Sequence, residues 1–465
     1  MSADAAGEVL LGRATVRPAV GVTEPAPWQP AAALLLVCLM FGGASQGNAL
    51  PVALTQVCAV AVLLHEAWRR RALGPPANAR LGLAFIGLAA VFLAAQLVPL
   101  PPAIWSSLPG RGPLADDLRL AGAGAVWRPI SLTPELTWRG LLALLPPTAL
   151  FVATADLDVS GRRRLAAVIL LFALASVLLA ALQLAGGPYS PLRFYSITNA
   201  DSGVGFFANR NHLASLLVVS MPLAAALAVD WGMEGRRGSA LRVAASLGVY
   251  LLLIVGVGVS LSRAGMLLLA PAVLASLAIA LAARGAYRQR PAALLLVGAS
   301  VMGLFLVGAF SLAAVAQRFH AEGATDIRFQ AAPVIVQTAA RYAPLGAGVG
   351  AFEPTYRAAE PMALVAPNYL NHAHNDYLEL WLEAGVGGAL GVLMFAAWWA
   401  WASFRAWTGA WRRRTESLLP AAASASVGLL LVHSLVDYPL RTLALSAVLA
   451  FCCGVLTHPR LPEGE

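Results

Sequence analysis

The chain has 465 residues and a formal net charge of +9, yet only 12% of its residues are charged and 59% are apolar. Soluble domains carry roughly 25% charged residues, so a chain of this size and composition could not cover itself with a polar surface in water. All 32 basic residues are Arg and lie between apolar runs rather than in one patch, which argues against a nucleic-acid partner and for the charged loops of a membrane protein.

Apolar runs of about 20 residues, the length that crosses a bilayer, recur from residue 31 to residue 457. They predict an all-α fold, that of a polytopic integral membrane protein with about twelve transmembrane helices and a large periplasmic loop that contains short helices. The predicted spans are 31–49, 51–68, 81–100, 139–156, 165–185, 211–230, 242–260, 264–283, 291–314, 379–403, 417–435 and 440–457.

The arginines predict the orientation. With the N-terminus in the cytoplasm, every cytoplasmic connection is short and rich in Arg, whereas the loops on the other side are longer and carry scattered Arg. We therefore expect a protein of the bacterial inner membrane, in contact with its lipids, whose chemistry faces the periplasm. The expected cytoplasmic arginines are Arg69, Arg70, Arg71, Arg80, Arg162, Arg163, Arg164, Arg236, Arg237, Arg284, Arg288, Arg290, Arg405, Arg412, Arg413 and Arg414.

The largest polar stretch, residues 315–378, divides the apolar runs into two groups. We expect it to be a periplasmic catalytic loop, because connections of this length are usually functional, with a short helix at 326–342 before a Gly-rich turn at 346–350. The predicted division is a cytoplasmic tail 1–30, transmembrane helices 1–9 over 31–314, the loop, transmembrane helices 10–12 over 379–457, and a cytoplasmic tail 458–465. All four cysteines lie inside apolar runs, which predicts small core residues rather than disulfides.

The densest polar cluster, Asn371-His372-Ala373-His374-Asn375-Asp376, comes just before the tenth predicted span. Imidazole titrates near neutral pH, so His372 or His374 could take a proton from a hydroxyl nucleophile. Two other interpretations stay open. The Asn and Asp side chains could cap the following helix, and the His-x-His pattern could ligate zinc together with ligands from elsewhere.

Three arginines on the outer side of the predicted bundle could bind an anion: Arg263 between the seventh and eighth spans, Arg210 at the mouth of the sixth, and Arg328 at the start of the loop helix. The guanidinium fork suits phosphate, and an Arg near hydrocarbon is costly unless it is paired or snorkels. Snorkelling and ordinary surface charge are the alternatives. At the outer end of the eleventh span, Asp437 could orient a His, pair with an Arg, or cap a helix end.

Several of these motifs resemble the O-antigen ligase and polymerase superfamily of membrane glycosyltransferases. The clearest is the ligase signature of His, then Asn, Ser or Gln, then nine residues and Gly-x-x-Gly, which here is His374, Asn375 and Gly385-Val-Gly-Gly388. The resemblance covers roughly residues 85–455. The other matching motifs are Gly205-Phe-Phe-Ala-Asn209-Arg-Asn211-His, Ser262-Arg263-Ala-Gly265, the run from Arg328 to Phe352, and His433-Ser-Leu-Val-Asp437.

The resemblance implies an inverting glycosyltransferase that needs no metal and no cofactor. Its donor would be a glycan on undecaprenyl diphosphate, and its acceptor a sugar hydroxyl of lipid A–core. His374 would be the general base and Asp437 a second catalytic residue, while Arg263, Arg328 and Arg210 would bind the diphosphate. The supporting residues would be His372, Asn375, Asn209, Asn211 and His433.

The sequence leaves three choices open. His372 could replace His374 as the base, and Arg318 or Arg341 could replace Arg328, because the aromatic residue that the family often places after its loop Arg is missing at that spacing. A polymerase that joins lipid-linked repeat units of O-antigen or exopolysaccharide is the alternative to a ligase. A lipid-linked glycan transporter is the alternative of another class, although charges at the ends of spans rather than at their middle favour surface chemistry.

Overall fold

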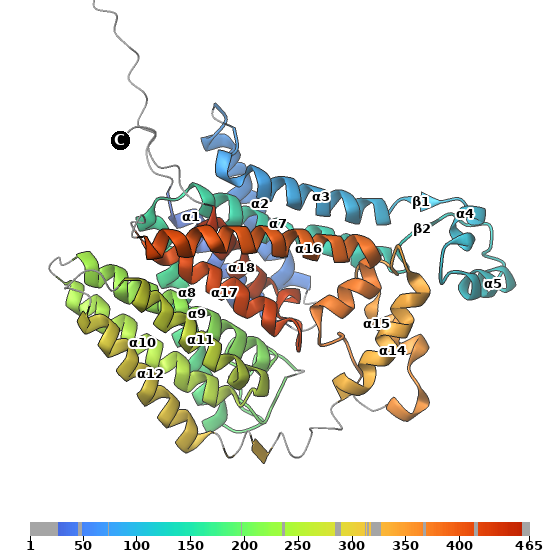
Figure 1. Ribbon diagram of the computed structural model, residues 1–465. Helices are drawn as coiled ribbons and strands as arrows, with labels where there is room; N and C mark the ends of the chain where they lie inside the picture. The colour runs from blue at the N-terminus through green and yellow to red at the C-terminus, as the bar shows by residue number, and fades with distance from the viewer. Residues whose placement is uncertain are drawn as a thin grey trace, which may run out of the picture.

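The computed structural model describes residues 27–44, 49–72, 74–196, 198–234, 238–283, 290–311, 313, 316–317, 327–365, 369–412 and 417–457. This part of the chain is mostly helical, with one short antiparallel pair of strands, β1 (Pro99–Leu100) and β2 (Arg128–Pro129). Figure 1 shows a bundle of long helices with smaller helices gathered at one end. The predicted all-α, polytopic membrane fold is confirmed. Most of the predicted N-terminal tail and all of the C-terminal tail lie outside the described residues.

In the described part of the chain, nine helices are long and apolar enough to cross a membrane, and they correspond to nine of the predicted spans. Two of them combine neighbouring elements, η1 with α3 and α6 with α7. The elements are α2 (Ala49–Arg69), η1 (Ala77–Ala79), α3 (Arg80–Gln96), α6 (Pro134–Leu142), α7 (Leu145–Asp156), α8 (Val159–Ala185), α9 (Arg210–Glu234), α10 (Ser239–Ser260), α11 (Arg263–Ala282), α12 (Arg290–Phe310) and α16 (Asp376–Trp411).

The other three predicted spans are shorter apolar helices, α1 (Gln29–Phe41), α17 (Leu419–His433) and α18 (Leu443–Leu456). At 1.5 Å per residue, α17 and α18 are each roughly 20 Å long, less than the ~30 Å hydrocarbon core. The predicted spans 417–435 and 440–457 both extend too far into the connection between the two helices, because α17 ends at His433 and α18 begins at Leu443. Between them residues 434–442, here called the α17–α18 link, leave the helical path and form η4 (Pro439–Arg441), where Pro439 removes a backbone donor.

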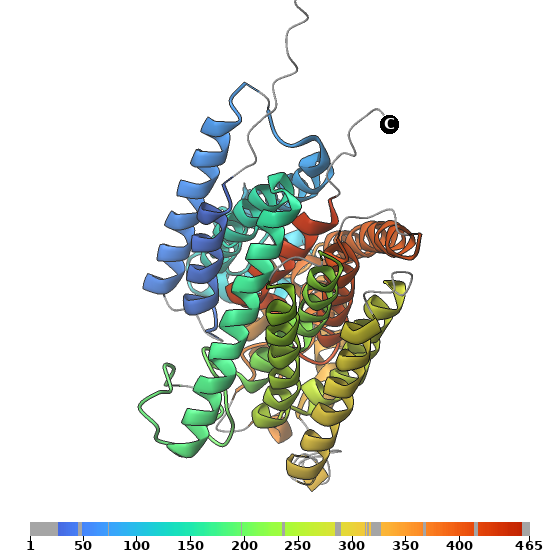
Figure 2. The ribbon, with the colours of Figure 1, turned by 90° about the vertical axis from the view of Figure 1, so that its left-hand side faces the viewer.

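Helix α9 lies at the centre of the bundle. It packs against α10, α11 and α17, and its apolar window is entirely buried. A helix that is apolar on all sides has no face suited to water, so it takes the core position. Figure 2 shows the blue helices α1 and α2 and the yellow helix α12 on opposite flanks of the bundle.

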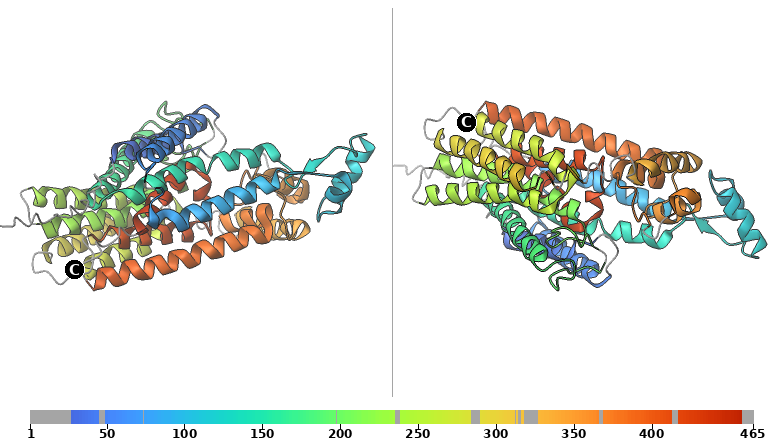
Figure 3. Two further views of the ribbon diagram at one scale, coloured as in Figure 1. Left: turned by 90° about the horizontal axis from the view of Figure 1, so that it is seen from above. Right: turned by 90° about the horizontal axis from the view of Figure 1, so that it is seen from below.

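The fourth predicted span, 139–156, is two helices rather than one. Helix α6 ends at Leu142 and α7 begins at Leu145, and the next two residues are prolines, which cannot donate to a preceding turn. Between α3 and α6 the chain passes through β1 and β2 and the short helices α4 (Pro102–Ser107) and α5 (Gly112–Leu120). Figure 3 shows α4 and α5 projecting beyond one end of the bundle.

The predicted loop 315–378 contains α14 (Ile327–Tyr342), α15 (Phe352–Ala359) and η3 (Met362–Leu364), which confirms its short helices. The predicted helix 326–342 matches α14, although residue 326 lies outside the described part. This loop has an apolar core of its own, in which Ile335 of α14, Phe352 and Tyr356 of α15, and Leu382 of α16 are buried together. The loop is therefore a packed unit seated on the start of α16.

Helix α16 is broken at Gly385, where φ is +53° and ψ is −139°. The Gly-rich turn after α14 pairs with backbone groups at this break: the Gly348 amide donates to the Glu383 carbonyl at 2.8 Å, and the Val386 amide donates to the Pro344 carbonyl at 2.9 Å. A Cβ atom on Gly385 would collide with that same carbonyl. The glycine of the Gly-x-x-Gly signature is thus required where helix and loop are joined through their backbones.

Polar contacts give the bundle two distinct ends. At the end rich in Arg, Arg69 at the end of α2 and Arg70 just after it both pair with Asp156 at the end of α7, and Arg163 of α8 pairs with Asp230 of α9 at 3.1 Å. The opposite end holds the start of α9, α11 and α16, the end of α17, and the loop helices. The candidate residues selected from the sequence lie at this second end.

The predicted core role of the cysteines is confirmed within the described residues. Cys38, Cys452 and Cys453 are buried, Cys58 is half-buried, and all four are free thiols.

Candidate functional site

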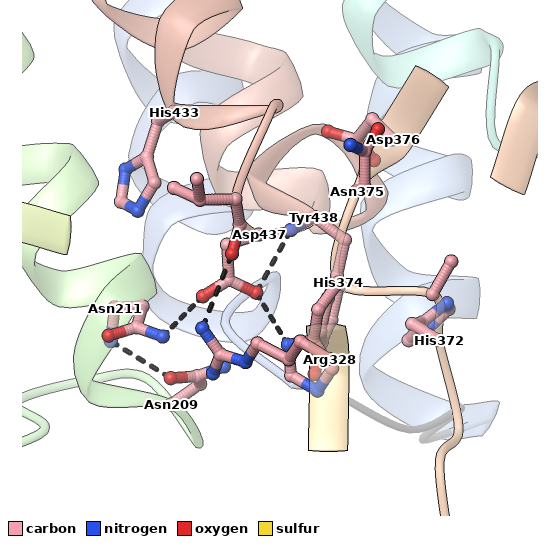
Figure 4. A network of polar contacts seen from close by, with 12 residues as sticks. Asn209, Asn211, Arg328, His372, His374, Asn375, Asp376, His433, Asp437 and Tyr438 are labelled. Carbon is pink, nitrogen blue, oxygen red and sulfur yellow. Dashed lines mark hydrogen bonds and ion pairs between the residues drawn. The ribbon is translucent and has the colours of Figure 1, made fainter. Parts of the chain in front are cut away.

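Asp437, in the α17–α18 link, is the centre of a polar network at the loop end of the bundle (Figure 4). Its side chain is fully buried. One carboxylate oxygen accepts from the Asn211 amide, and the other is 3.0 Å from His374 Nδ1 and accepts from the Tyr438 amide at 3.0 Å. Burial alone raises the pKa of Asp437, but the hydrogen bond to His374 and the charge of Arg328 hold this pKa well below its usual range. The site therefore contains a buried, ionised carboxylate.

His374 is held in an unusual backbone conformation, with φ of +49°. A non-glycine residue with positive φ is strained, and such strain persists where the surroundings hold it. A carboxylate only accepts hydrogen bonds, so Asp437 requires the proton on His374 Nδ1 and leaves Nε2 as an acceptor. Among the described residues no group bonds this Nε2, and it is not buried, in contrast to both ring nitrogens of His212. His374 can thus take a proton from a group that enters the site.

Arg328, at the start of α14, lies beside the same carboxylate. Its guanidinium donates to the Val436 carbonyl at 3.2 Å, next to Asp437. Arg341 is in the last turn of the same helix, about 20 Å away by helical rise, and Arg318 lies outside the described residues. Of the two candidate arginines of the loop that lie in the described residues, Arg328 and Arg341, Arg328 is therefore the one that lies beside Asp437.

Arg263 begins α11 and is half-buried. The preceding residue, Ser262, belongs to the network, because its hydroxyl donates to the Asn211 side-chain oxygen at 2.7 Å and also caps the helix through the Gly265 amide. Asn211 in turn donates to Asp437. The chain thus brings Arg263 within one residue of the network, at the positive N-terminal end of a helix.

Arg210 begins α9 and is tied to the loop before it. Its guanidinium lies 3.3 Å from both carboxylate oxygens of Asp201 and donates to the Ser202 hydroxyl at 3.0 Å. Its own amide donates to the Asn199 side chain at 3.0 Å. The charge of Arg210 is therefore partly offset by Asp201.

The two asparagine motifs have local structural roles. The Asn209 side chain accepts from the Asn211 amide at 2.9 Å and so shapes the start of α9. Asn375 is the N-cap of α16, accepting from the amides of Tyr377 and Leu378 at 3.0 Å, and it donates to the Leu435 carbonyl at 2.9 Å. The capping interpretation is correct for Asn375, and the cap also anchors the α17–α18 link.

His433 and His212 lie deeper in the bundle. His433 Nδ1 is 2.7 Å from the Ser215 hydroxyl of α9, and its other ring nitrogen is buried without a partner. The His212 ring is fully buried and packs edge-on against Tyr438 at 4.8 Å between centroids. The Asp437 amide donates to the His433 backbone carbonyl at 3.0 Å, but among the described residues no hydrogen bond joins the two side chains, so the His433 ring lies beside the His374–Asp437 pair rather than in it.

A second charged cluster lies next to the first, around Arg441 of η4. Its guanidinium is 2.9 Å from Glu383, 3.4 Å from Glu379 and 3.7 Å from Asp376. Although burial alone lowers the pKa of Arg441, these three carboxylates raise it above its usual value. His372 joins the cluster, because its Nδ1 lies 2.7 Å from Glu379. Arg441 therefore holds the first turns of α16 against the α17–α18 link.

None of the sequence motifs indicated Arg441, Glu379 or Glu383. A signal was present, because two glutamates four residues apart at the start of an apolar span need a buried cation as a partner. The zinc interpretation finds no support in this geometry: in the ranges that the structure describes, no three His, Cys, Asp or Glu side chains are grouped to hold a metal ion.

Residues 248–395 match the sequence model of the family described as O-antigen ligase. Over these 148 residues, about a third of the chain, the protein is similar to that family. The match begins in α10 and ends in α16, so the matched region contains Arg263, Arg328, His372 and His374, whereas Asn211 and Asp437 come from outside it. Members of this family are glycosyltransferase-like membrane enzymes, ligases and polymerases, and the match supports the resemblance drawn from the motifs. None of the curated proteins matches the chain.

Proposed function

We propose that the protein transfers a glycan from undecaprenyl diphosphate to a sugar hydroxyl of an acceptor, with inversion at the anomeric carbon and without a metal ion. The observation that carries the proposal is the pairing of His374 with the buried Asp437 beside Arg328. A general base, its orienting carboxylate and a phosphate-binding cation in one site are the groups that this reaction needs. The domain match to the O-antigen ligase family supports the substrate class.

In the proposed reaction, His374 Nε2 takes the proton of the acceptor hydroxyl while the oxygen attacks the anomeric carbon. The bond between that carbon and the diphosphate oxygen breaks, and its electron pair stays on the leaving diphosphate. Asp437 keeps the required tautomer and stabilises the imidazolium that forms, as an acidic partner does in other His-dependent sites. Atoms and charge balance without an additional reactant.

The diphosphate gains negative charge as it leaves, so cations fixed nearby stabilise the transition state. Arg328 and Arg263 are assigned to this role, because each lies at the start of a helix next to the Asp437 network. Arg210 is assigned a lesser role, since Asp201 partly offsets its charge. The packed unit of α14 and α15 is then the catalytic loop, and the Arg-rich opposite end favours a periplasmic site by the positive-inside rule.

The proposed acceptor is lipid A–core, which makes the protein a ligase, and the fit of His374, Asn375 and Gly385 to the ligase signature is the observation in favour. A polymerase that joins lipid-linked repeat units is the second candidate, because the same base and arginines would serve it. Both candidates form a glycosidic bond, which separates them from a transporter.

The test is glycan transfer by the purified protein in liposomes that contain an undecaprenyl-diphosphate oligosaccharide, with lipid A–core or a second lipid-linked repeat as acceptor. We expect activity that persists with EDTA and falls at least about 100-fold in His374→Ala, since general base catalysis contributes that much or more. His65→Ala, which changes a histidine of α2 outside the network, is the matched control. Full activity of His374→Ala, or movement of the glycan lipid without a new glycosidic bond, would refute the proposal.

A further inference from the structure

A second histidine–carboxylate pair lies beside the first. His372 Nδ1 is 2.7 Å from Glu379, and His374 Nδ1 is 3.0 Å from Asp437. Both carboxylates are almost fully buried, with side-chain exposures of 1% and 0%, while the two imidazoles are 23% and 16% exposed. Each pair thus has its carboxylate inside the protein and its imidazole at the surface of the site.

Both imidazoles also rest on one phenol ring. His372 packs on Tyr438 at 4.3 Å between centroids with an interplanar angle of 33°, and His374 meets it at 4.9 Å and 69°. Figure 4 shows His372 across the Tyr438 ring from Asp437. The centroids of the two imidazoles are therefore no further apart than the sum of these two distances.

The Nε2 atoms of the two histidines are in the same chemical state. Glu379, like Asp437, only accepts hydrogen bonds, so the His372 proton is on Nδ1 and Nε2 is an acceptor. Arg441 contacts Glu379 at 3.4 Å and favours its ionised form. Among the described residues no group bonds His372 Nε2, and this atom is not buried. The site thus offers two fixed acceptors to hydroxyl donors.

We propose that His372 Nε2 binds a second hydroxyl of the acceptor sugar, next to the one that His374 deprotonates. A sugar ring presents several O–H donors at fixed spacing, which suits two rigid acceptors, whereas the diphosphate presents only acceptors and suits the arginines. His372 is in this way a binding and specificity residue for the acceptor. The inference rests on the proposed glycosyl transfer and names the part of the substrate that this second pair recognises.

Two substitutions separate this role from a structural one. In His372→Gln the amide oxygen can reach the place of Nε2, but the bond to Glu379 is lost. In His372→Asn the amide nitrogen can replace Nδ1 and keep the bond to Glu379, but nothing replaces Nε2. If His372 binds the acceptor, His372→Gln should preserve acceptor binding and His372→Asn should not. If His372 has only a structural role through its bond to Glu379, the two variants should show the reverse.

The experiment is acceptor titration in the liposome assay, with lipid A–core and a lipid-linked repeat tested separately, for the wild type and both variants. We expect His372→Asn to raise the acceptor KM about tenfold, the effect of one lost hydrogen bond, with kcat and donor KM within about threefold of wild type, and His372→Gln to stay near wild type. An acceptor that lacks the hydroxyl next to the attacking one should lose about tenfold in the wild type but lose nothing further in His372→Asn.

The proposal is overturned if Asn preserves the acceptor KM, if both variants lower kcat and raise donor KM together, or if the deoxy acceptor is penalised equally in wild type and His372→Asn. Thermal unfolding of each variant shows whether it is folded. If His372→Asn does not fold, the acceptor that lacks the hydroxyl is compared in His372→Gln and wild type. We then expect the same loss of transfer with this acceptor in both proteins. Absence of transfer by the wild type with either acceptor is a different result, because it refutes the glycosyltransferase itself.

Discussion

His374 and Asp437 are 63 positions apart in the chain, and the fold brings His374 Nδ1 to 3.0 Å from the Asp437 carboxylate. Asp437 is buried in the α17–α18 link, and His374 precedes α16 in a strained conformation. The relation between these residues controls which imidazole nitrogen carries the proton, and it underlies the first two predictions.

Asp437→Asn should reduce kcat by about 10²- to 10⁴-fold, because an amide can donate to Nδ1 and stabilise the tautomer that is unable to accept the hydroxyl proton. The measurement is glycan transfer at saturating acceptor and donor. Asp117→Asn, on the exposed surface of α5, is the matched control and should retain activity. A wild-type rate in Asp437→Asn would mean that this carboxylate does not orient the base.

Asp437 also makes a pH-dependent contribution to stability. Its pKa is lower in the folded protein than the ordinary value of 3.8, so this stabilisation is complete above the ordinary value and is lost as the pH falls through the folded-state value. We expect a constant gap in melting temperature between wild type and Asp437→Asn above about pH 5, and a gap that shrinks below about pH 4. Thermal unfolding in detergent across this range measures it, and a gap that widens toward acid would contradict the assignment.

Arg328→Ala should lower kcat by about 10²- to 10³-fold, because one fixed donor at a developing charge is worth that much, and Arg328→Lys should recover only part of the loss. Arg341→Ala changes the same residue type at the opposite end of α14 and should change the rate little. If Arg341→Ala has the larger effect, the diphosphate contacts the far end of α14 instead.

Gly385→Ala should destabilise the protein by about 2 kcal/mol or more, because alanine has a Cβ that would collide with the Pro344 carbonyl and is strained at φ of +53°. Gly391, further along the same helix, has no atom within 4 Å of an added Cβ, so Gly391→Ala should be neutral or stabilise by up to about 1 kcal/mol. Melting temperatures of the two variants compare them directly. Equal effects would show that the break in α16 carries no strain of this kind.

Arg441→Gln should cost about 3 kcal/mol, because it leaves three neighbouring carboxylates without their cation. Arg357→Gln removes an exposed pair with Glu353 and should cost less than about 0.5 kcal/mol. Thermal unfolding in detergent is again the measurement. A small effect of Arg441→Gln would indicate that Glu379 and Glu383 are neutral in the folded protein.

The positions of the long helices could be predicted because each apolar run of about 20 residues has one stable solution in lipid. His374, Asp437, Arg328 and Asn375 could be selected because their motifs are local, and the structure places the first three around one carboxylate network. The matched domain supports the family but does not contain Asp437.

Other features depend on contacts that no local pattern encodes. Arg441 meets Glu383 across 58 positions, and its motif, a Pro-Leu-Arg turn, indicates only the end of a helix. The break at Gly385 lies in a continuous apolar pattern, and only the approach of the Gly-rich turn shows why the helix stops there. The predicted spans 417–435 and 440–457 run slightly into the α17–α18 link, because Leu435 and Leu440 continue the apolar pattern of the neighbouring helix.

The shortness of α17 and α18 affects how a lipid-linked donor would arrive. Because α17 and α18 are each roughly 20 Å long and the hydrocarbon core is ~30 Å thick, their link with Asp437 would, under the proposed function, lie no further out than the lipid headgroups. The undecaprenyl chain of the proposed donor would then stay among the acyl chains while its head group enters the site from the side. Under the proposed function, the supply of donor would be diffusion in two dimensions, governed by the surface density of the carrier in the membrane rather than by a concentration in water.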